Sequence, residues 1–158
     1  MTVPTSSHFA RGPGGERMRS FLGTPLTFLI DSADTGGAYS LMEAILRPGE
    51  EPPPHVHTTE DEAYYILDGA WTFRCGATST EAGPGSLVFL PRHLQHSFTV
   101  HAEAARALVL ISPGGLDAAF HELSRPEDAA EAPPLGQVLE TFGRYGVQFP
   151  APPPDARP

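Results

Sequence analysis

The chain has 158 residues, enough for one domain with a buried core, and 40% of them are hydrophobic. Its formal net charge is −9, and a surface of that sign repels phosphate backbones and anionic lipid heads, which argues against nucleic acid and membranes as partners. The single cysteine, Cys75, cannot form an internal disulfide, and we find neither a signal-peptide core nor an apolar run near the ~20 residues that cross a bilayer. We therefore expect a cytoplasmic protein.

The two ends of the chain differ in composition from its middle. Residues 1–16 are small, polar and rich in Gly and Pro, which predicts a flexible arm, with pairing of part of the arm as an edge strand as the alternative. Residues 150–158 are mostly proline and predict an extended tail. Between them we expect one β-barrel over residues 17–125 and a segment that packs on it over 126–149.

Short strand-like runs alternate with turn signals along the middle of the chain. A Gly-Thr-Pro sequence interrupts the first run, Arg47-Pro48-Gly49 closes the second, and Asp68-Gly69 has the composition of a hairpin turn. Short strands at nearly regular spacing favour an all-β sandwich or barrel over an α/β fold. The expected strands lie within residues 19–30, 39–46, 63–67, 70–75, 86–90, 97–101 and 105–112.

Two helices are expected after the last strand. The first spans residues 116–124, between a Pro-Gly-Gly turn and Pro126, and its Phe120 is placed to cap the opening of a barrel. The second spans residues 137–145 between two glycines, and an irregular arm over the barrel is the alternative for this segment.

The most informative stretch is GEEPPPHVHTTEDEAYYILDG, residues 49–69. His55 and His57 are two residues apart, which in a strand places both imidazoles on one face. Glu62 follows five residues after His57, an odd offset that would place it on the opposite face of a straight strand. The polar segment 58–61 must therefore form a turn or bulge for Glu62 to face the histidines.

A third imidazole, His96, begins the run HSFTV, in which Phe98 and Val100 share its face. Three neutral nitrogens and one carboxylate suit a divalent first-row ion such as Fe, Mn, Ni, Co or Zn. Four protein ligands on an octahedral ion leave two positions for water, dioxygen or a chelating substrate. The predicted metal ligands are His55, His57, Glu62 and His96.

These residues resemble the first motif of the cupin superfamily, G-x5-H-x-H-x4-E-x6-G. Every spacing of that motif is met by Gly49, His55, His57, Glu62 and Gly69. The resemblance implies a double-stranded β-helix, also called a jelly-roll barrel, with these side chains around one ion. A metal-free pocket with acid–base or idle histidines is the alternative.

The second cupin motif, G-x5-P-x-G-x2-H-x3-N, is met in part. Gly85, Pro91 and His96 match, whereas His93 stands in place of the second glycine and Val100 in place of the asparagine. A histidine at His93 must adopt or reshape a backbone turn that glycine normally permits. Either it binds a substrate at the barrel mouth, or it is an exposed turn residue, which we prefer.

Several neighbours of the ligands have simpler expected roles. Glu60 and Asp61 are expected to be solvated turn residues, although a shorter motif spacing would make Asp61 the ligand. Arg92 could attract an acidic substrate, but an ordinary solvated arginine is preferred. His121 finds no partner at any usable spacing and is expected at the surface. Cys75 is expected to be a small buried side chain without a nucleophilic role.

Residues around the ligands predict a substrate pocket. Tyr64 shares the face of Glu62, and Phe98 shares the face of His96, so both are predicted to bind substrate. Phe73 is predicted to join them, with a place in the core as an equal alternative. Tyr65 and Leu67 make the opposite face apolar too, and that face needs cover from a second sheet or a second subunit. This pattern and the resemblance predict a homodimer.

Three functions fit the predicted centre. The chain resembles small cupins similar to quercetin 2,3-dioxygenase, which implies an oxygenase that acts on a small aromatic or hydroxy-carbonyl substrate with dioxygen, with Glu62 as the catalytic proton acceptor. A non-redox isomerase, cyclase or lyase of a natural-product pathway is the second function. The third is a metal- or small-molecule-binding protein without turnover.

Overall fold

In this computed structural model, the structure describes residues 8–11, 17–126 and 132–150. The prediction of a flexible arm falls mainly on residues outside these ranges, as does that of an extended tail. The described residues form an all-β fold with two short helices, as the alternating pattern predicted. None of the helices in the described part of the chain is long and apolar enough to span a bilayer.

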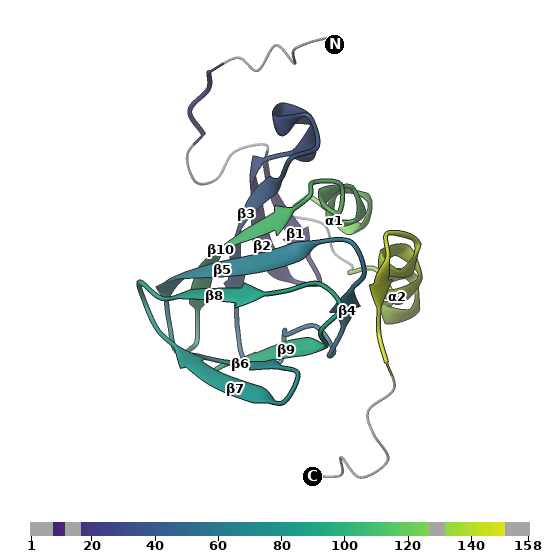
Figure 1. The fold of residues 1–158 in the computed structure, drawn as a ribbon. Helices are drawn as coiled ribbons and strands as arrows, with labels where there is room; N and C mark the ends of the chain where they lie inside the picture. The colour runs from purple at the N-terminus through teal and green to yellow at the C-terminus, as the bar shows by residue number, and fades with distance from the viewer. Residues whose placement is uncertain (1–7, 12–16, 127–131, 151–158) are drawn as a thin grey trace.

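Two antiparallel sheets face each other and enclose the core (Figure 1). The larger sheet has six strands, in the order β1 (Met18–Phe21), β2 (Thr24–Ile30), β3 (Ser40–Leu46), β10 (Ala105–Ser112), β5 (Asp61–Asp68) and β8 (Leu87–Leu90). The smaller sheet has three, in the order β7 (Thr78–Ala82), β6 (Trp71–Cys75) and β9 (His96–Val100). A two-stranded pair joins β11 (Val147–Gln148) to β4 (Val56–His57).

Alternation along the strands builds the core between the sheets. In β5, Glu62, Tyr64 and Ile66 are buried while their neighbours are more exposed. In β9, His96, Phe98 and Val100 face inward in the same way. Both faces agree with the predicted parity, because successive side chains of a strand point to opposite sides. The largest fully buried side chain is that of Trp71, which is 1% exposed.

The predicted hairpin at Asp68-Gly69 is wrong. Strand β5 pairs with β10 and β8, whereas β6 pairs with β7 and β9, so the chain leaves one sheet at Gly69 and enters the other. The hairpin of this region joins β6 to β7 around Gly76. Strand β7 has no apolar pattern that would predict it, because its residues are polar and mostly exposed.

Two helices lie at one end of the barrel (Figure 1). Helix α1 spans Asp117–Leu123, close to its expected range, and α2 spans Leu135–Arg144, where the helix and not the irregular arm is found. Phe120 of α1 contacts Phe21 of β1 and Phe142 of α2, with ring centroids 5.1 and 4.9 Å away in edge-to-face geometry. Edge-to-face aromatic pairs add to the burial energy, so this cluster holds the helices on the barrel.

Gly69 allows the crossing between the two sheets, and we predict that Gly69→Ala is more destabilising than Gly85→Ala. Both residues have positive φ, of 84° and 85°, so both substitutions carry the left-handed backbone penalty of about 1 kcal/mol. A Cβ at position 69 would also lie 3.0 Å from Cα and Cβ of Ala105, whereas position 85 is open. Overpacking adds roughly 1–3 kcal/mol for Gly69→Ala.

Urea unfolding of both variants measures this difference. Equal unfolding free energies for the two variants would show that the contact with Ala105 is relieved at no cost.

Candidate metal centre

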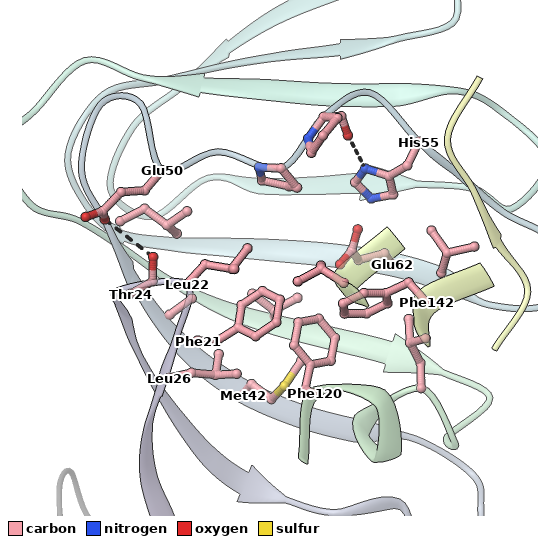
Figure 2. Close-up of a pocket in the computed structure, with 18 of the residues that line it drawn as sticks. Phe21, Leu22, Thr24, Leu26, Met42, Glu50, His55, Glu62, Phe120 and Phe142 are labelled. Carbon is pink, nitrogen blue, oxygen red and sulfur yellow. Dashed lines mark hydrogen bonds between the residues drawn. The ribbon is translucent and has the colours of Figure 1, made fainter. Parts of the chain in front are cut away.

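The four predicted ligands converge on one point in the core. One ligand atom from each of His55, His57, Glu62 and His96 lies within 4.8 Å of every other, and all four side chains are buried. The backbones of His55 and His96 exchange two hydrogen bonds of 3.0 and 2.9 Å, which places their side chains next to each other. Glu62 reaches the same point from β5 in the larger sheet, and Figure 2 shows His55 and Glu62 pointing toward each other.

The odd offset between His57 and Glu62 is resolved by a change of sheet. Strand β4 ends at His57, residues 58–60 form a loop, and β5 begins at Asp61 in the larger sheet. Because the two strands belong to different sheets, parity does not carry across the loop. The predicted turn is therefore present, and it directs Glu62 back to the histidines.

Backbone carbonyls orient two of the imidazoles. Nδ1 of His55 lies 2.8 Å from the carbonyl oxygen of Pro53, and Nδ1 of His96 lies 3.2 Å from that of Leu94. A carbonyl can only accept, so each Nδ1 donates its hydrogen and each Nε2 keeps a free lone pair. The two Nε2 atoms face each other at 3.1 Å, as two ligands of one ion would.

The electrostatics of the cluster favour a neutral His55 and an ionised Glu62. Burial lowers the pKa of His55 to about 4, which keeps its imidazole neutral near pH 7. Burial alone would raise the pKa of Glu62, but the adjacent imidazoles of His96 and His57 bring the pKa down to about 2. Burial would likewise lower the pKa of His57, yet the carboxylates of Glu60 and Glu62 raise it.

The donor set fits a divalent cation. Among the described residues, five buried side-chain polar atoms lack a hydrogen-bond partner, and four of them belong to His57, Glu60 and Glu62. Nε2 of His57 and Oε2 of Glu62 are among these atoms and lie 3.7 Å apart. Buried polar atoms normally have a hydrogen-bond partner. A metal ion bound by Nε2 of His57 and Oε2 of Glu62 would be the missing partner of both atoms. The cluster could therefore hold one ion.

Glu60 and Asp61 were expected to be solvated turn residues. This is wrong for Glu60 and only partly right for Asp61. Glu60 is buried, at 6% exposure, and its Oε2 lies 3.4 Å from Nδ1 of His57. Its position three residues after His57 is the sequence signal, but only the folded loop turns it inward. Asp61 points away from the cluster and forms an ion pair of 2.8 Å with Arg92, which lowers the pKa of Asp61 to about 2. It is not among the converging ligands.

A mainly apolar cavity adjoins the cluster, and His55 and Glu62 belong to its lining (Figure 2). Tyr64 and Phe98 line this cavity, and Tyr64 donates a hydrogen bond of 3.3 Å to Oε1 of Glu62. Phe73 lies outside the lining and is 1% exposed, in an aromatic cluster with Trp71. The substrate roles assigned to these residues remain predictions. Phe120 lines the cavity from α1, in the capping position expected for it.

Neither His93 nor Cys75 contributes its side chain to the cluster. His93 has φ of 69° and an exposed side chain, so it adopts the left-handed turn that glycine serves in the motif. Its amide donates a hydrogen bond of 2.8 Å to the carbonyl of His57, which links this turn to the ligand strand. Cys75 is half-buried, and burial raises the pKa of its thiol, which disfavours the thiolate.

A second group of possible ligands, Asp31, Asp117 and His121, lies outside the cavity. Its carboxylates already have partners, because Asp117 accepts hydrogen bonds from the backbone and hydroxyl of Ser32 and Asp31 binds Arg17. His121 contacts Asp31 at 2.7 Å and stacks on a core phenylalanine, so it has the partner that the sequence did not reveal.

Comparisons with known proteins agree with this geometry. The family model described as "Cupin domain" matches residues 42–114. An uncharacterized protein of Streptomyces coelicolor is 30% identical over 91 residues, which cover 58% of this chain and 81% of that protein. Quercetin 2,3-dioxygenase of Bacillus subtilis is 22% identical over 126 residues, or 79% of this chain and 37% of the dioxygenase. The chain thus spans well under half of that enzyme.

Among solved structures, an RmlC-like cupin from Shewanella frigidimarina matches with a TM-score of 0.59 at 18% identity. The match covers 73% of this chain and 99% of that one. It confirms the expected jelly-roll fold, and at this identity it carries no information on activity.

We predict that His57→Ala and His96→Ala each weaken metal binding by more than about 100-fold, because changes that touch only the partners of ligands already cost about 10–100-fold. His93→Ala is the matched control, since this histidine is nearby but exposed. Elemental analysis after gel filtration measures the metal bound per chain. An unchanged metal content in both ligand variants would disprove the assignment of the centre.

Proposed function

This chain belongs to the cupin superfamily, and within it we propose a metal-dependent oxygenase that acts on a small aromatic or hydroxy-carbonyl substrate. The observation that carries the proposal is a buried His3Glu cluster of which His55, His57 and Glu62 line an apolar cavity. A divalent transition ion there would polarise substrate oxygens and, if redox-active, support reaction with dioxygen. The similarity to quercetin 2,3-dioxygenase supports this reaction class.

Glu62 is proposed as the proton acceptor for a substrate hydroxyl. Its carboxylate is ionised near neutral pH, and only Oε2 faces the histidines, at 3.3 Å from Nε2 of His96. Oε1 accepts a hydrogen bond from the hydroxyl of Tyr64, so the carboxylate of Glu62 contacts both the histidines and a residue of the cavity wall. Burial and the charge of Glu62 raise the pKa of Tyr64 well above its usual value, which keeps this tyrosine a hydrogen-bond donor.

The lining of the cavity favours an uncharged substrate. Its polar members are few, and none of the lining residues is an arginine. The chain contains no lysine either, so an anionic group would enter without a counter-charge from the wall. Glu50 lies at the end of the cavity remote from the cluster, where Thr24 donates a hydrogen bond of 3.4 Å to it (Figure 2). A flavonol, catechol or 1,3-diketone meets these conditions.

A non-redox lyase or isomerase is the second candidate. The hydrogen-bonded pair of Tyr64 and Glu62 favours it, because a phenol and a carboxylate side by side offer a proton donor and a proton acceptor without dioxygen. A redox-inert ion such as zinc would serve this chemistry equally well.

We further propose that the protein is a homodimer through the outer face of the larger sheet. Tyr65, Leu87, Phe89 and Leu110 are 43%, 68%, 59% and 38% exposed on three adjacent strands. The strand registers pair Tyr65 with Leu87. They also pair Ala63 with Phe89 on one side and with Leu110 on the other.

The rest of this outer face favours a second copy as the occupant. Its charged residues are paired, Glu43 with Arg106 at 2.9 Å and Asp61 with Arg92 at 2.8 Å, which leaves a neutral apolar surface. A second copy of the chain has the same neutral face, and a dimer with twofold symmetry would bury the outer faces of both copies.

For the oxygenase, we predict substrate-dependent oxygen consumption by protein reconstituted with Fe(II), Mn(II), Co(II) or Ni(II). An oxygen electrode and a panel of flavonols, catechols and 1,3-diketones measure it. Glu62→Gln should lower the rate by about 100-fold or more, in the range of general acid–base contributions. His93→Ala should retain the rate of the wild-type protein, because its side chain is exposed.

No oxygen uptake with any of these metal forms would rule out the oxygenase. Product formed from the same panel without oxygen, or with Zn(II), would favour the lyase or isomerase. Substrate binding without any product would support the binding function.

For the homodimer, we predict a dimer mass at micromolar concentration by light scattering after gel filtration. Phe89→Glu should yield monomers, because it places a charge inside the proposed apolar interface. Leu135→Glu is the matched control: this leucine is 56% exposed on α2, away from the sheet face. A monomeric wild-type protein, or a dimer unaffected by Phe89→Glu, would contradict the proposed interface.

A further inference from the structure

We infer that Glu60 is a positioning residue of the metal centre, and this inference rests on the proposed metal-dependent function. Its carboxylate holds the imidazole of His57 with Nε2 toward the ion and supplies the second negative charge that a divalent ion requires. The two side chains are 7% and 4% exposed, and the distance from Oε2 of Glu60 to Nδ1 of His57 is 3.4 Å. Neither motif of the family resemblance includes this position.

The three histidines differ in what holds their outer nitrogen. His55 and His96 donate Nδ1–H to backbone carbonyls, at 2.8 and 3.2 Å. Nδ1 of His57 has no such carbonyl, and the Glu60 carboxylate is its acidic neighbour within 4.0 Å among the described residues. A group that accepts the hydrogen of one imidazole nitrogen fixes the other nitrogen as the ligand. Glu60 lies on the same side of the His57 ring as these carbonyls do for the other two, at ion-pair distance of Nδ1 and without a hydrogen bond to it in this structure.

The burial of Glu60 is itself unexplained without a cation. Arg92 is near enough to interact with Glu60 through space, but its guanidinium binds both carboxylate oxygens of Asp61. A buried carboxylate without a positive partner carries a large desolvation cost. Two buried carboxylates, Glu60 and Glu62, together balance the charge of one divalent ion, whereas Glu62 alone would leave a net positive centre in an apolar cavity.

The loop that carries Glu60 is fixed from outside the cluster. Thr58 donates two hydrogen bonds to the carbonyl of Gly146, from its amide at 3.1 Å and its hydroxyl at 2.7 Å. Val147 then pairs with His57 in the β11–β4 ladder. These contacts hold the chain before Glu60, and after it the carboxylate of Asp61 accepts a hydrogen bond of 2.9 Å from the amide of Arg92. The carboxylate of Glu60 therefore has a defined place.

The test compares metal binding by the full chain with Glu60→Gln, Glu60→Asp and Asp61→Asn. Dissociation constants for Co(II) and Zn(II) are measured by chelator competition, and the visible spectrum of the Co(II) form reports the ligand geometry. Glu60→Gln should weaken binding by about 10–100-fold and alter the spectrum. Glu60→Asp keeps the charge but shortens the side chain, so its affinity should lie between those of Glu60→Gln and the wild-type protein.

Asp61→Asn is the matched control. It removes the same charge one residue away, from a surface ion pair with Arg92, and should change the affinity by less than about fivefold. In metal-free protein, the nitrogen-15 shifts of the His57 ring should indicate the Nδ1–H tautomer in wild type and a mixture in Glu60→Gln. Circular dichroism checks that each variant is folded.

The outcomes separate this inference from the proposed function. Unchanged affinity, spectrum and tautomer in Glu60→Gln would overturn the role of Glu60, while the metal centre itself would stand on the loss of metal in His57→Ala. Wild-type protein that takes up neither metal would overturn both. Equal losses in Glu60→Gln and Asp61→Asn would show a general effect of surface charge and would also overturn the inference.

Discussion

Two imidazole nitrogens with free lone pairs face each other at 3.1 Å in the interior of this protein, and the rest of the site depends on how that repulsion is relieved. A carboxylate oxygen of Glu62 lies 3.3 Å from the same nitrogen of His96, so a third electron-rich atom joins them. In a medium of low dielectric constant such a cluster is strongly unfavourable unless a cation occupies its centre. Protonation of His55 is a poor substitute, because burial lowers its pKa to about 4.

The fold brings these atoms together through backbone contacts. The hydrogen-bonded bridge between His55 and His96 sets the spacing of two ligands, and it lies between segments far apart in the chain. Glu62 comes from the facing sheet, so an ion at the centre would link both layers of the barrel. Binding energy at such a site is also folding energy, because the unfolded chain has no preformed site. The β11–β4 pair extends this link to the C-terminal helix.

The ligand set was predictable because it follows from local rules. Parity along a strand placed His55 with His57 and Glu62 with Tyr64, and the motif spacing supplied His96. Other features depend on contacts that no local pattern encodes. The Asp68-Gly69 dipeptide predicts a turn but not which strand pairs next, and here the chain changes sheets. Glu60 has the composition of a solvated turn residue, and only the packing of its loop makes it buried.

The apolar walls of the cavity connect the charge of the centre to its chemistry. A divalent ion held with the two carboxylates would be neutral overall, and a neutral substrate would then bring no charge into a poorly solvated space. A proton that passes from a substrate hydroxyl to Glu62 stays within the cavity, so the total charge there is unchanged. An anionic substrate would add a charge that no arginine of the lining compensates. For the proposed function, the same low dielectric that disfavours the unneutralised cluster would favour uncharged hydroxyl compounds and a proton acceptor beside the ion.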